Sequence, residues 1–393
     1  MRLPSPALLA DRRARLVTAM HEHDLAALVL YANPSIFGVV TGTHGHLRYL
    51  SGFTDRFAPS ALVLMATGSA ALHVATPDAV LKAVELSGIT DVRREDPPRY
   101  GQACRQLLAR TARRQRVGIV GQAEMPLPVA RALLDRAPFR TVESDDLLHH
   151  LRLIKGPEEI RLLRRAAVLA DRMFQVLFRE AGRGRWIYQA RARMELAAKL
   201  GGAEFATCWI TTGPVPDRQR YMPDESWRRF TAGDQIISGL YLQYQGYWGH
   251  AIRMGTCGRP SEAVQQSHRR MREVQEGARA EIRPGREVAH LARHLGTALA
   301  TAFPKYGDRT FRPAHGIGLD YSERPISDFF PQPYARVKGS RPPRLLFQPG
   351  MVLELHPNVM DPRVGFAALG DLCLVTADGC EALTRFPREL AIV

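Results

Sequence analysis

The chain has 393 residues, of which 45% are hydrophobic and 24% charged. This composition excludes wholesale disorder, and the length exceeds what one hydrophobic core usually supports, so we expect two domains. The formal net charge of +15 raises nucleic acid as a partner, because lysine and arginine neutralise phosphates. The arginines are spread along predicted helices, however, which favours an arginine-rich solvated surface.

Cysteines and apolar runs indicate the compartment. The five cysteines are scattered without CxxC or CxxH spacing, which favours reduced thiols over a disulfide framework or a zinc knuckle. The N-terminus lacks the apolar run of a signal peptide, and no segment approaches the roughly 18 apolar residues that a membrane span needs. We therefore expect a cytoplasmic protein.

The first 152 residues alternate helical and strand patterns, which predicts a compact α/β domain. The predicted elements are a helix at 10–23, a strand at 24–32, two strands around a turn at 67–69, a helix at 77–87, a strand at 116–122 and a helix at 127–134. A loop is expected over 38–57, and it carries His44, His46 and Arg56. Loop residues are free to bind substrate, although a solvated loop is the commoner role.

A long helix marks the start of the second domain, which we place at 153–393. Pro157 suits the first turn of a helix, and Glu158 and Glu159 complement its dipole. Apolar residues then recur in steps of three and four over 160–177, which predicts one buried face. Further elements are expected as helices at 186–200, 261–281 and 286–303 and as strands within 208–213, 234–257, 350–359 and 371–384.

The stretch RPAHGIGLDYSERP at 312–325 places a histidine beside small residues. It resembles the histidine motif of the creatinase, aminopeptidase P and methionine aminopeptidase superfamily. RYLSGF at 48–53 and IKGPEEI at 154–160 resemble further motifs of that superfamily. The resemblance implies an α/β (α+β) chain with an N-terminal creatinase-type domain, a C-terminal pita-bread domain whose curved antiparallel sheet is covered by helices, and assembly as a homodimer.

In that superfamily two metals are held by two aspartates, a histidine and two glutamates. This chain keeps the surrounding motifs, but the implied ligand positions are occupied by Gly239, His250, His315, His356 and Gly370. The glycines fall where the resemblance implies the second metal, which excludes an ordinary two-metal centre. Three neutral imidazoles from three strands can bind one divalent ion with open positions, and either zinc or iron(II) would suit them. A single histidine near a core is more often structural, so the metal prediction depends on all three together.

Four neighbouring residues are further candidates. Because strand side chains repeat every two residues, Glu354 should face the same side as His356, and Tyr241 the same side as Gly239. Glu354 is a candidate general base, extra ligand or partner that orients an imidazole, with a solvated strand carboxylate as the alternative. Tyr221 stands where the resemblance implies the creatinase base, although its usual pKa of about 10 makes it a poor one. Ser322 replaces a second histidine of the superfamily and is a candidate for substrate binding.

These observations predict a divergent pita-bread enzyme rather than a normal Xaa-Pro peptidase. We expect it to act on a small amino-acid-like or amide substrate at one metal, by carbon–nitrogen hydrolysis or, with iron, by an oxidative reaction. The proline-rich segment 326–347 is predicted to be a lid over the pocket, with a plain surface loop as the alternative. The rival functions are a metal-free pseudoenzyme or binding scaffold and a nucleic-acid-binding protein, the latter suggested only by the net charge.

Overall fold

The structure is a computed structural model that describes residues 4–34, 43–217, 227–311, 313–326 and 344–393. It divides into two compact units. The N-terminal unit comprises Met1–Leu153 together with Leu319–Ser322, and the C-terminal unit comprises Ile154–Gly318 and Glu323–Val393. No helix among the described residues is long and apolar enough to cross a membrane.

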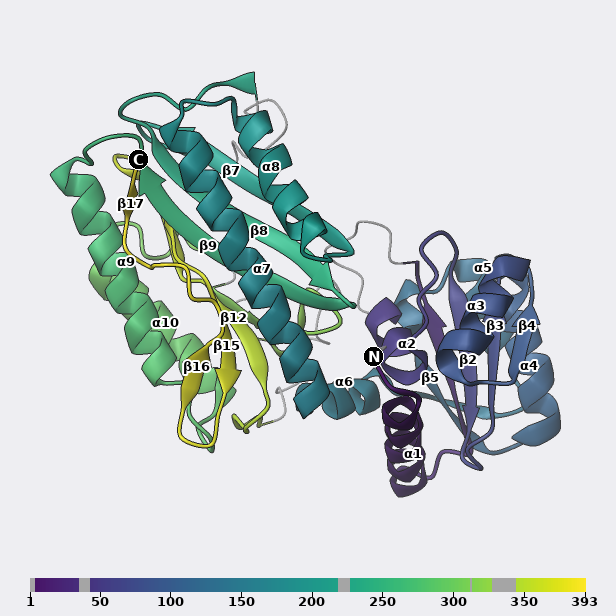
Figure 1. Cartoon of the computed structure of the whole chain (residues 1–393). Coiled ribbons are helices and arrows are strands. Elements are labelled where there is room, and N and C mark those ends of the chain that lie inside the picture. The colour runs from purple at the N-terminus through teal and green to yellow at the C-terminus, as the bar shows by residue number, and fades with distance from the viewer. Residues whose placement is uncertain (1–3, 35–42, 218–226, 312, 327–343) are drawn as a thin grey trace. The chain divides into compact units, whose positions relative to one another are not determined.

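The N-terminal unit is built on one six-stranded mixed sheet with strand order β4-β3-β2-β1-β5-β6 (Figure 1). Its strands are β1 (Ala27–Ala32), β2 (Ser60–Met65), β3 (Ala70–Val74), β4 (Asp91–Arg94), β5 (Arg116–Val120) and β6 (Arg140–Glu143). Its helices are α1 (Pro6–Glu22), α2 (Thr43–Ser51), α3 (Pro77–Ser87), α4 (Tyr100–Thr111), α5 (Leu127–Leu134) and α6 (Asp145–Leu153). Every residue of β1 is buried, which places the core on both faces of the central strand.

Two of the predicted N-terminal elements differ from the structure. Helix α1 begins at Pro6, before the expected start, because the Ser5 side chain accepts a hydrogen bond from the Leu8 amide and caps the helix. The expected loop over 38–57 was wrong at Thr43–Ser51, which form α2. Leu47 and Leu50 are buried on that helix, and their spacing of three gives it an apolar face.

In its described residues, the C-terminal unit combines three antiparallel or mixed sheets with four helices. Its helices are α7 (Pro157–Gly182), α8 (Ile187–Leu200), α9 (Glu262–Ala280) and α10 (Val288–Ala302). Its strands are β7 (Phe205–Gly213), β8 (Gln235–Tyr244), β9 (Tyr247–Thr256), β10 (Ala314–Gly316), β11 (Glu323–Ile326), β12 (Val352–Leu355), β13 (Asn358–Asp361), β14 (Gly365–Ala368), β15 (Asp371–Val375), β16 (Cys380–Ala382) and β17 (Ala391–Ile392). The sheets have the orders β17-β9-β8-β7, β11-β10-β12-β15-β16 and β13-β14.

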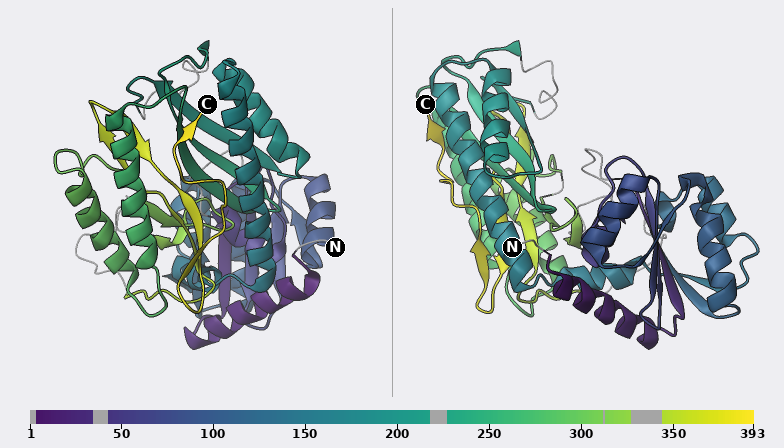
Figure 2. Two further views of the ribbon diagram at one scale, coloured as in Figure 1. Left: turned by 60° about the vertical axis from the view of Figure 1, so that its left-hand side comes forward. Right: turned by 45° about the vertical axis from the view of Figure 1, so that its right-hand side comes forward.

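Helices cover the sheets of this unit, as the pita-bread prediction expects. Helices α7 and α8 pack on β7, β8 and β9, and α9 packs against α10 and β14 (Figures 1 and 2). Helix α7 begins where the sequence predicted, and the Gly156 amide donates to the Glu159 carboxylate at 2.9 Å. A bridge between Ile252 and Gly370 connects the β9 sheet with the β15 sheet, so these two sheets form one continuous floor.

Candidate metal and catalytic site

Three buried histidines converge on the floor of the C-terminal unit. His250 lies on β9, His315 on β10, and His356 directly after β12. Their side chains are at most 2% exposed. The ring centroids are 6.2 Å apart for His250 and His315, 5.6 Å for His250 and His356, and 5.3 Å for His315 and His356. The structure therefore brings together the three histidines that the sequence singled out.

Strand pairing positions the three rings. His315 stands opposite Glu354 in the β10 and β12 ladder, and His250 stands opposite Tyr241 in the β8 and β9 hairpin. His356 occupies the break between β12 and β13, where Pro357 cannot donate to a ladder. The sequence had predicted one uninterrupted strand at that point.

The tautomer of His315 follows from the atoms around it. Nδ1 of His315 lies 2.8 Å from the Gly316 carbonyl oxygen, an acceptor, so this nitrogen carries the proton and the lone pair is at Nε2. Nδ1 of His250 lies 3.0 Å from Oε1 of Glu354, a close contact with a carboxylate. The His315 ring is thus held as metal-ligating histidines usually are, with one nitrogen bound to a carbonyl oxygen.

Glu354 is fully buried, with 0% of its side chain exposed. This burial contradicts the alternative of a solvated strand carboxylate. A buried carboxylate needs a positive or hydrogen-bonding partner, and Nδ1 of the His250 imidazole lies 3.0 Å from its Oε1. The Tyr241 ring lies beside His250, with the two ring centroids 4.9 Å apart.

The two glycines at the implied ligand positions face side chains from neighbouring strands. A Cβ atom at Gly239 would lie 2.5 Å from Cζ2 and Nε1 of Trp209, which stands opposite it on β7. A Cβ atom at Gly370 would lie 2.5 Å from Oε1 of Glu354 and 2.9 Å from the Ile252 amide nitrogen. An aspartate or a glutamate at these positions would therefore have to displace atoms already there.

The donor chemistry of the three imidazoles and the carboxylate fits a divalent ion. Within the described parts of the chain, no group of three or more His, Cys, Asp or Glu side chains has its donor atoms gathered for a metal. On a tetrahedral zinc with bonds of roughly 2.0 Å, imidazole centroids stand roughly 5 Å apart. The observed separations of 5.3 to 6.2 Å are wider, so ligation requires the rings to move closer by about 1 Å or less.

Other predicted residues lie elsewhere. Tyr221 lies outside the described residues, as does most of the predicted lid at 326–347. Ser322 is half-buried and belongs to the short segment that clusters with the N-terminal unit. Asp371 follows Gly370 and points into a separate buried cluster, where its Oδ1 lies 2.7 Å from Arg253.

The N-terminal histidines form a buried cluster with residues that sequence reasoning missed. Nη1 of Arg152 donates to Nδ1 of His46 at 2.9 Å, and Nη2 lies 2.6 Å from Asp320, which lies 3.3 Å from Nε2 of His44. Burial lowers the pKa of His46 well below its usual value, and the charge of Arg152 lowers it further. His44 and His46 are therefore interior residues of α2, not loop residues as predicted, whereas Arg56 is exposed. Asp320 lies within the histidine motif at 312–325, and that motif is the sequence signal that could have identified it.

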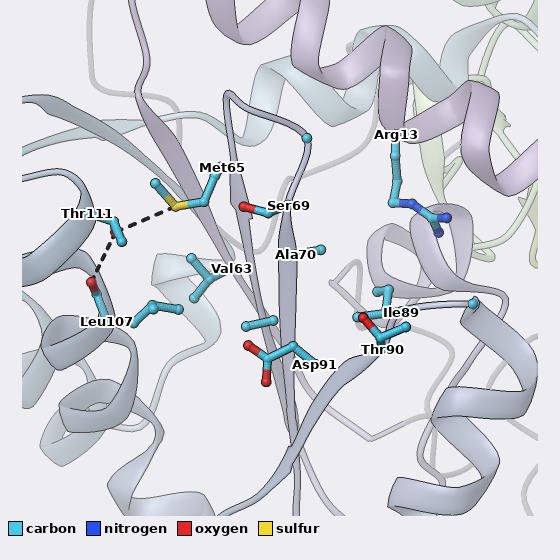
Figure 3. A pocket seen from close by; sticks show the side chains of 13 residues that line it. Arg13, Val63, Met65, Ser69, Ala70, Ile89, Thr90, Asp91, Leu107 and Thr111 are labelled. Carbon is cyan, nitrogen blue, oxygen red and sulfur yellow. Dashed lines mark hydrogen bonds between the residues drawn. The ribbon is translucent and has the colours of Figure 1, made fainter.

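A separate cavity of about 380 Å³ lies in the N-terminal unit (Figure 3). Its lining includes Arg13, Met65, Leu107 and Thr111. The Arg13 guanidinium donates to the backbone carbonyls of Leu50 and Ser87. Because the Arg13 side chain is engaged in these structural hydrogen bonds, we do not regard this cavity as a candidate site comparable with the histidine cluster.

Comparisons with known proteins agree with the fold. The sequence matches Metallopeptidase family M24 over 161–377 and the Creatinase/Prolidase N-terminal domain over 12–154. It is 24% identical to the Xaa-Pro dipeptidase of Pyrococcus horikoshii over 275 residues, 68% of this chain and 73% of that protein. It is 27% identical to the probable dipeptidase PepE of Mycobacterium tuberculosis over 295 residues, 70% of this chain and 73% of that protein.

Solved structures give the same result. Dipeptidase PepE from Mycobacterium ulcerans superposes with a TM-score of 0.79 at 24% identity, covering 99% of each chain. The prolidase from Pyrococcus horikoshii superposes with a TM-score of 0.76 at 22% identity, covering 97% of this chain and 99% of that one. These likenesses confirm the predicted fold, a creatinase-like α/β domain followed by a pita-bread domain. The chain belongs to metallopeptidase family M24, within the superfamily that its motifs resemble.

Proposed function

We propose that the chain is a divergent M24 hydrolase that cleaves a carbon–nitrogen bond in a small amino-acid-like or amide substrate. One divalent metal, zinc or iron, would be held by His250, His315 and His356. The observation that carries the proposal is the convergence of three buried imidazoles from three strands beside one buried carboxylate. A bound divalent ion would act as a Lewis acid and lower the pKa of a water molecule.

The role of Glu354 in this proposal is to orient His250. Its carboxylate lies 3.0 Å from Nδ1 of His250, and in the proposed metal-bound state it would accept the Nδ1 proton and leave Nε2 to the metal. The Gly316 carbonyl does the same for His315. Tyr241 is half-buried, and its ring lies beside that of His250.

The space at Gly239 and Gly370 supports one metal rather than two. Trp209 fills the first position and Glu354 the second, so neither offers room for an additional carboxylate without a rearrangement. An Xaa-Pro dipeptidase activity, which the names of the relatives report for those proteins, is therefore not the activity proposed here.

A metal-free binding scaffold is the second candidate function. It is favoured by the absence, among the described residues, of a donor group already gathered for a metal. The buried polar floor counts against it, because an interior without a ligand is more stable when it is apolar.

Metal content separates the two candidates. The protein is purified without chelator or histidine tag, reconstituted anaerobically with zinc or iron(II), and its metal is measured by mass spectrometry. We expect about one equivalent per chain, lost in His250→Ala, His315→Ala and His356→Ala but retained in His294→Ala, a matched change on α10. No metal under any of these conditions would favour the scaffold.

A further inference from the structure

A cavity of about 540 Å³ in the C-terminal unit is lined mainly by charged residues. It lies between α9 and the segment that follows β16, which runs between α7 and α9 (Figure 1). The charged side chains in its lining are Arg272, Arg279, Arg385, Arg388, Glu276 and Glu389. Four arginines against two glutamates leave an excess of positive charge facing one hollow.

The two glutamates in the lining are engaged by a single arginine. Nε of Arg272 lies 3.6 Å from Oε1 of Glu276, and its Nη1 lies 3.4 Å from Oε1 of Glu389. Among the described residues, the guanidinium groups of Arg279 and Arg385 have no hydrogen bond or ion pair. The charge of Glu381 acts on Arg385 from nearby, but neither guanidinium is tied to a described carboxylate by a hydrogen bond, and a concave surface concentrates the field of both.

The remaining arginine is fixed in place. Nε of Arg388 lies 2.8 Å from Oδ2 of Asp371, and the other oxygen of that carboxylate is bound by Arg253 and by the Thr384 hydroxyl, each at 2.7 Å. Because Asp371 is shared between two arginines, its charge does not cancel both. Arg388 is thus held in position beside the cavity. The charged side chains of the cavity lining together remain positive.

We propose that this cavity binds the dianionic phosphate group of a small molecule, free or as a monoester, through Arg279, Arg385 and Arg388. Planar guanidinium groups match phosphate oxygens with paired hydrogen bonds, which an ammonium group does not do. The cavity volume of about 540 Å³ accommodates a small phosphorylated metabolite. The site is distinct from the histidine cluster and does not depend on a bound metal.

Calorimetry tests the proposal with inorganic phosphate and ribose 5-phosphate as probes. Arg279→Gln and Arg385→Gln should each weaken binding roughly tenfold, the loss of one charge-assisted interaction. Arg385 is exposed and Arg279 half-buried, and neither guanidinium makes a hydrogen bond among the described residues, so the melting temperature should change little. Arg131→Gln, an exposed arginine on α5, is the matched control and should bind as the unmodified chain does.

The outcomes separate the sources of the phosphate. Equal affinity for the two probes would support recognition of the free ion, and tighter binding of the ester would support a phosphorylated metabolite. No binding of either probe up to roughly 10 mM would overturn the proposal, as would binding that neither variant weakens. Binding of a single-stranded oligonucleotide alone, lost on adding salt, would overturn it too and would assign the surface to nucleic acid.

Discussion

Replacing Gly239 by alanine tests whether Trp209 occupies the space at this position. The added Cβ would lie 2.5 Å from Cζ2 and Nε1 of the indole, well inside van der Waals contact. Trp209 is nearly buried on β7, and its ring centroid lies 6.1 Å from that of Phe366. The indole therefore cannot move aside without disturbing its packing.

The added methyl group should lower the free energy of unfolding by the amount typical of an overpacked core. Inserting a methyl group into a well-packed site typically destabilises by about 1–3 kcal/mol. In a domain of the size of the C-terminal unit, each kcal/mol lowers the melting temperature by roughly 2–4 °C. Trp209→Leu removes the clashing ring, so Gly239→Ala should cost less in that background, with a coupling energy of about 1–3 kcal/mol between the two sites.

The assay is a double-mutant cycle of Gly239→Ala and Trp209→Leu. The free energy of unfolding of the C-terminal unit is measured for each variant by thermal and urea denaturation. Gly277→Ala is the control, because its Cβ would meet nothing closer than His294 at 3.4 Å, and alanine favours a helix. That control should be neutral or stabilising. Additive effects of the two changes, or no destabilisation by Gly239→Ala, would refute the assignment of Trp209 to this space.

Other predictions concern charge, activity and assembly. Burial opposes ionisation of Asp371, but the charges of Arg253 and Arg388 hold its pKa below the usual value; its ionised form therefore stabilises the fold above the unfolded pKa of about 3.9, and this is lost as pH falls through the folded pKa. Asp371→Asn should flatten the acid limb of a plot of melting temperature against pH, and an unchanged limb would contradict this. Glu354→Gln should weaken zinc binding roughly 10–100-fold in a chelator competition, and unaltered affinity would remove the orienting role toward His250. The unmodified protein should not hydrolyse Xaa-Pro dipeptides, and robust hydrolysis would show that the ligand register is wrong. Light scattering should give a dimer, and a clean monomer would contradict the assembly that the resemblance implies.

Elements with strong periodicity could be predicted from the sequence. The apolar steps over 160–177 indicated α7, and Pro157 with Glu159 indicated its start, because capping and burial act within a few residues of each other. The histidine positions could also be read, since motifs preserve the strand order that brings them together. Short polar edge strands such as β4 and β6 were missed because half-exposed edges have little apolar pattern.

Long-range side-chain packing could not be predicted. The sequence shows a glycine at 239 but gives no sign that Trp209, thirty positions earlier, lies over it. Likewise, α2 is stabilised by burial of Leu47 and Leu50, whereas its glycine and histidine residues suggested a loop. The contact of His44 and Arg152 with Asp320 depends on a chain segment that is remote in sequence.

Each of the two glycines at the implied ligand positions is matched by a large side chain on a neighbouring strand. Loss of a ligand by drift leaves a hole, which costs stability in proportion to its volume. Here the indole of Trp209 covers Gly239, and the carboxylate of Glu354 covers Gly370 while contacting His250. A carboxylate is an expensive group to bury for filling space alone. Its presence beside three imidazoles therefore supports the proposal of a remodelled site over that of a decayed one.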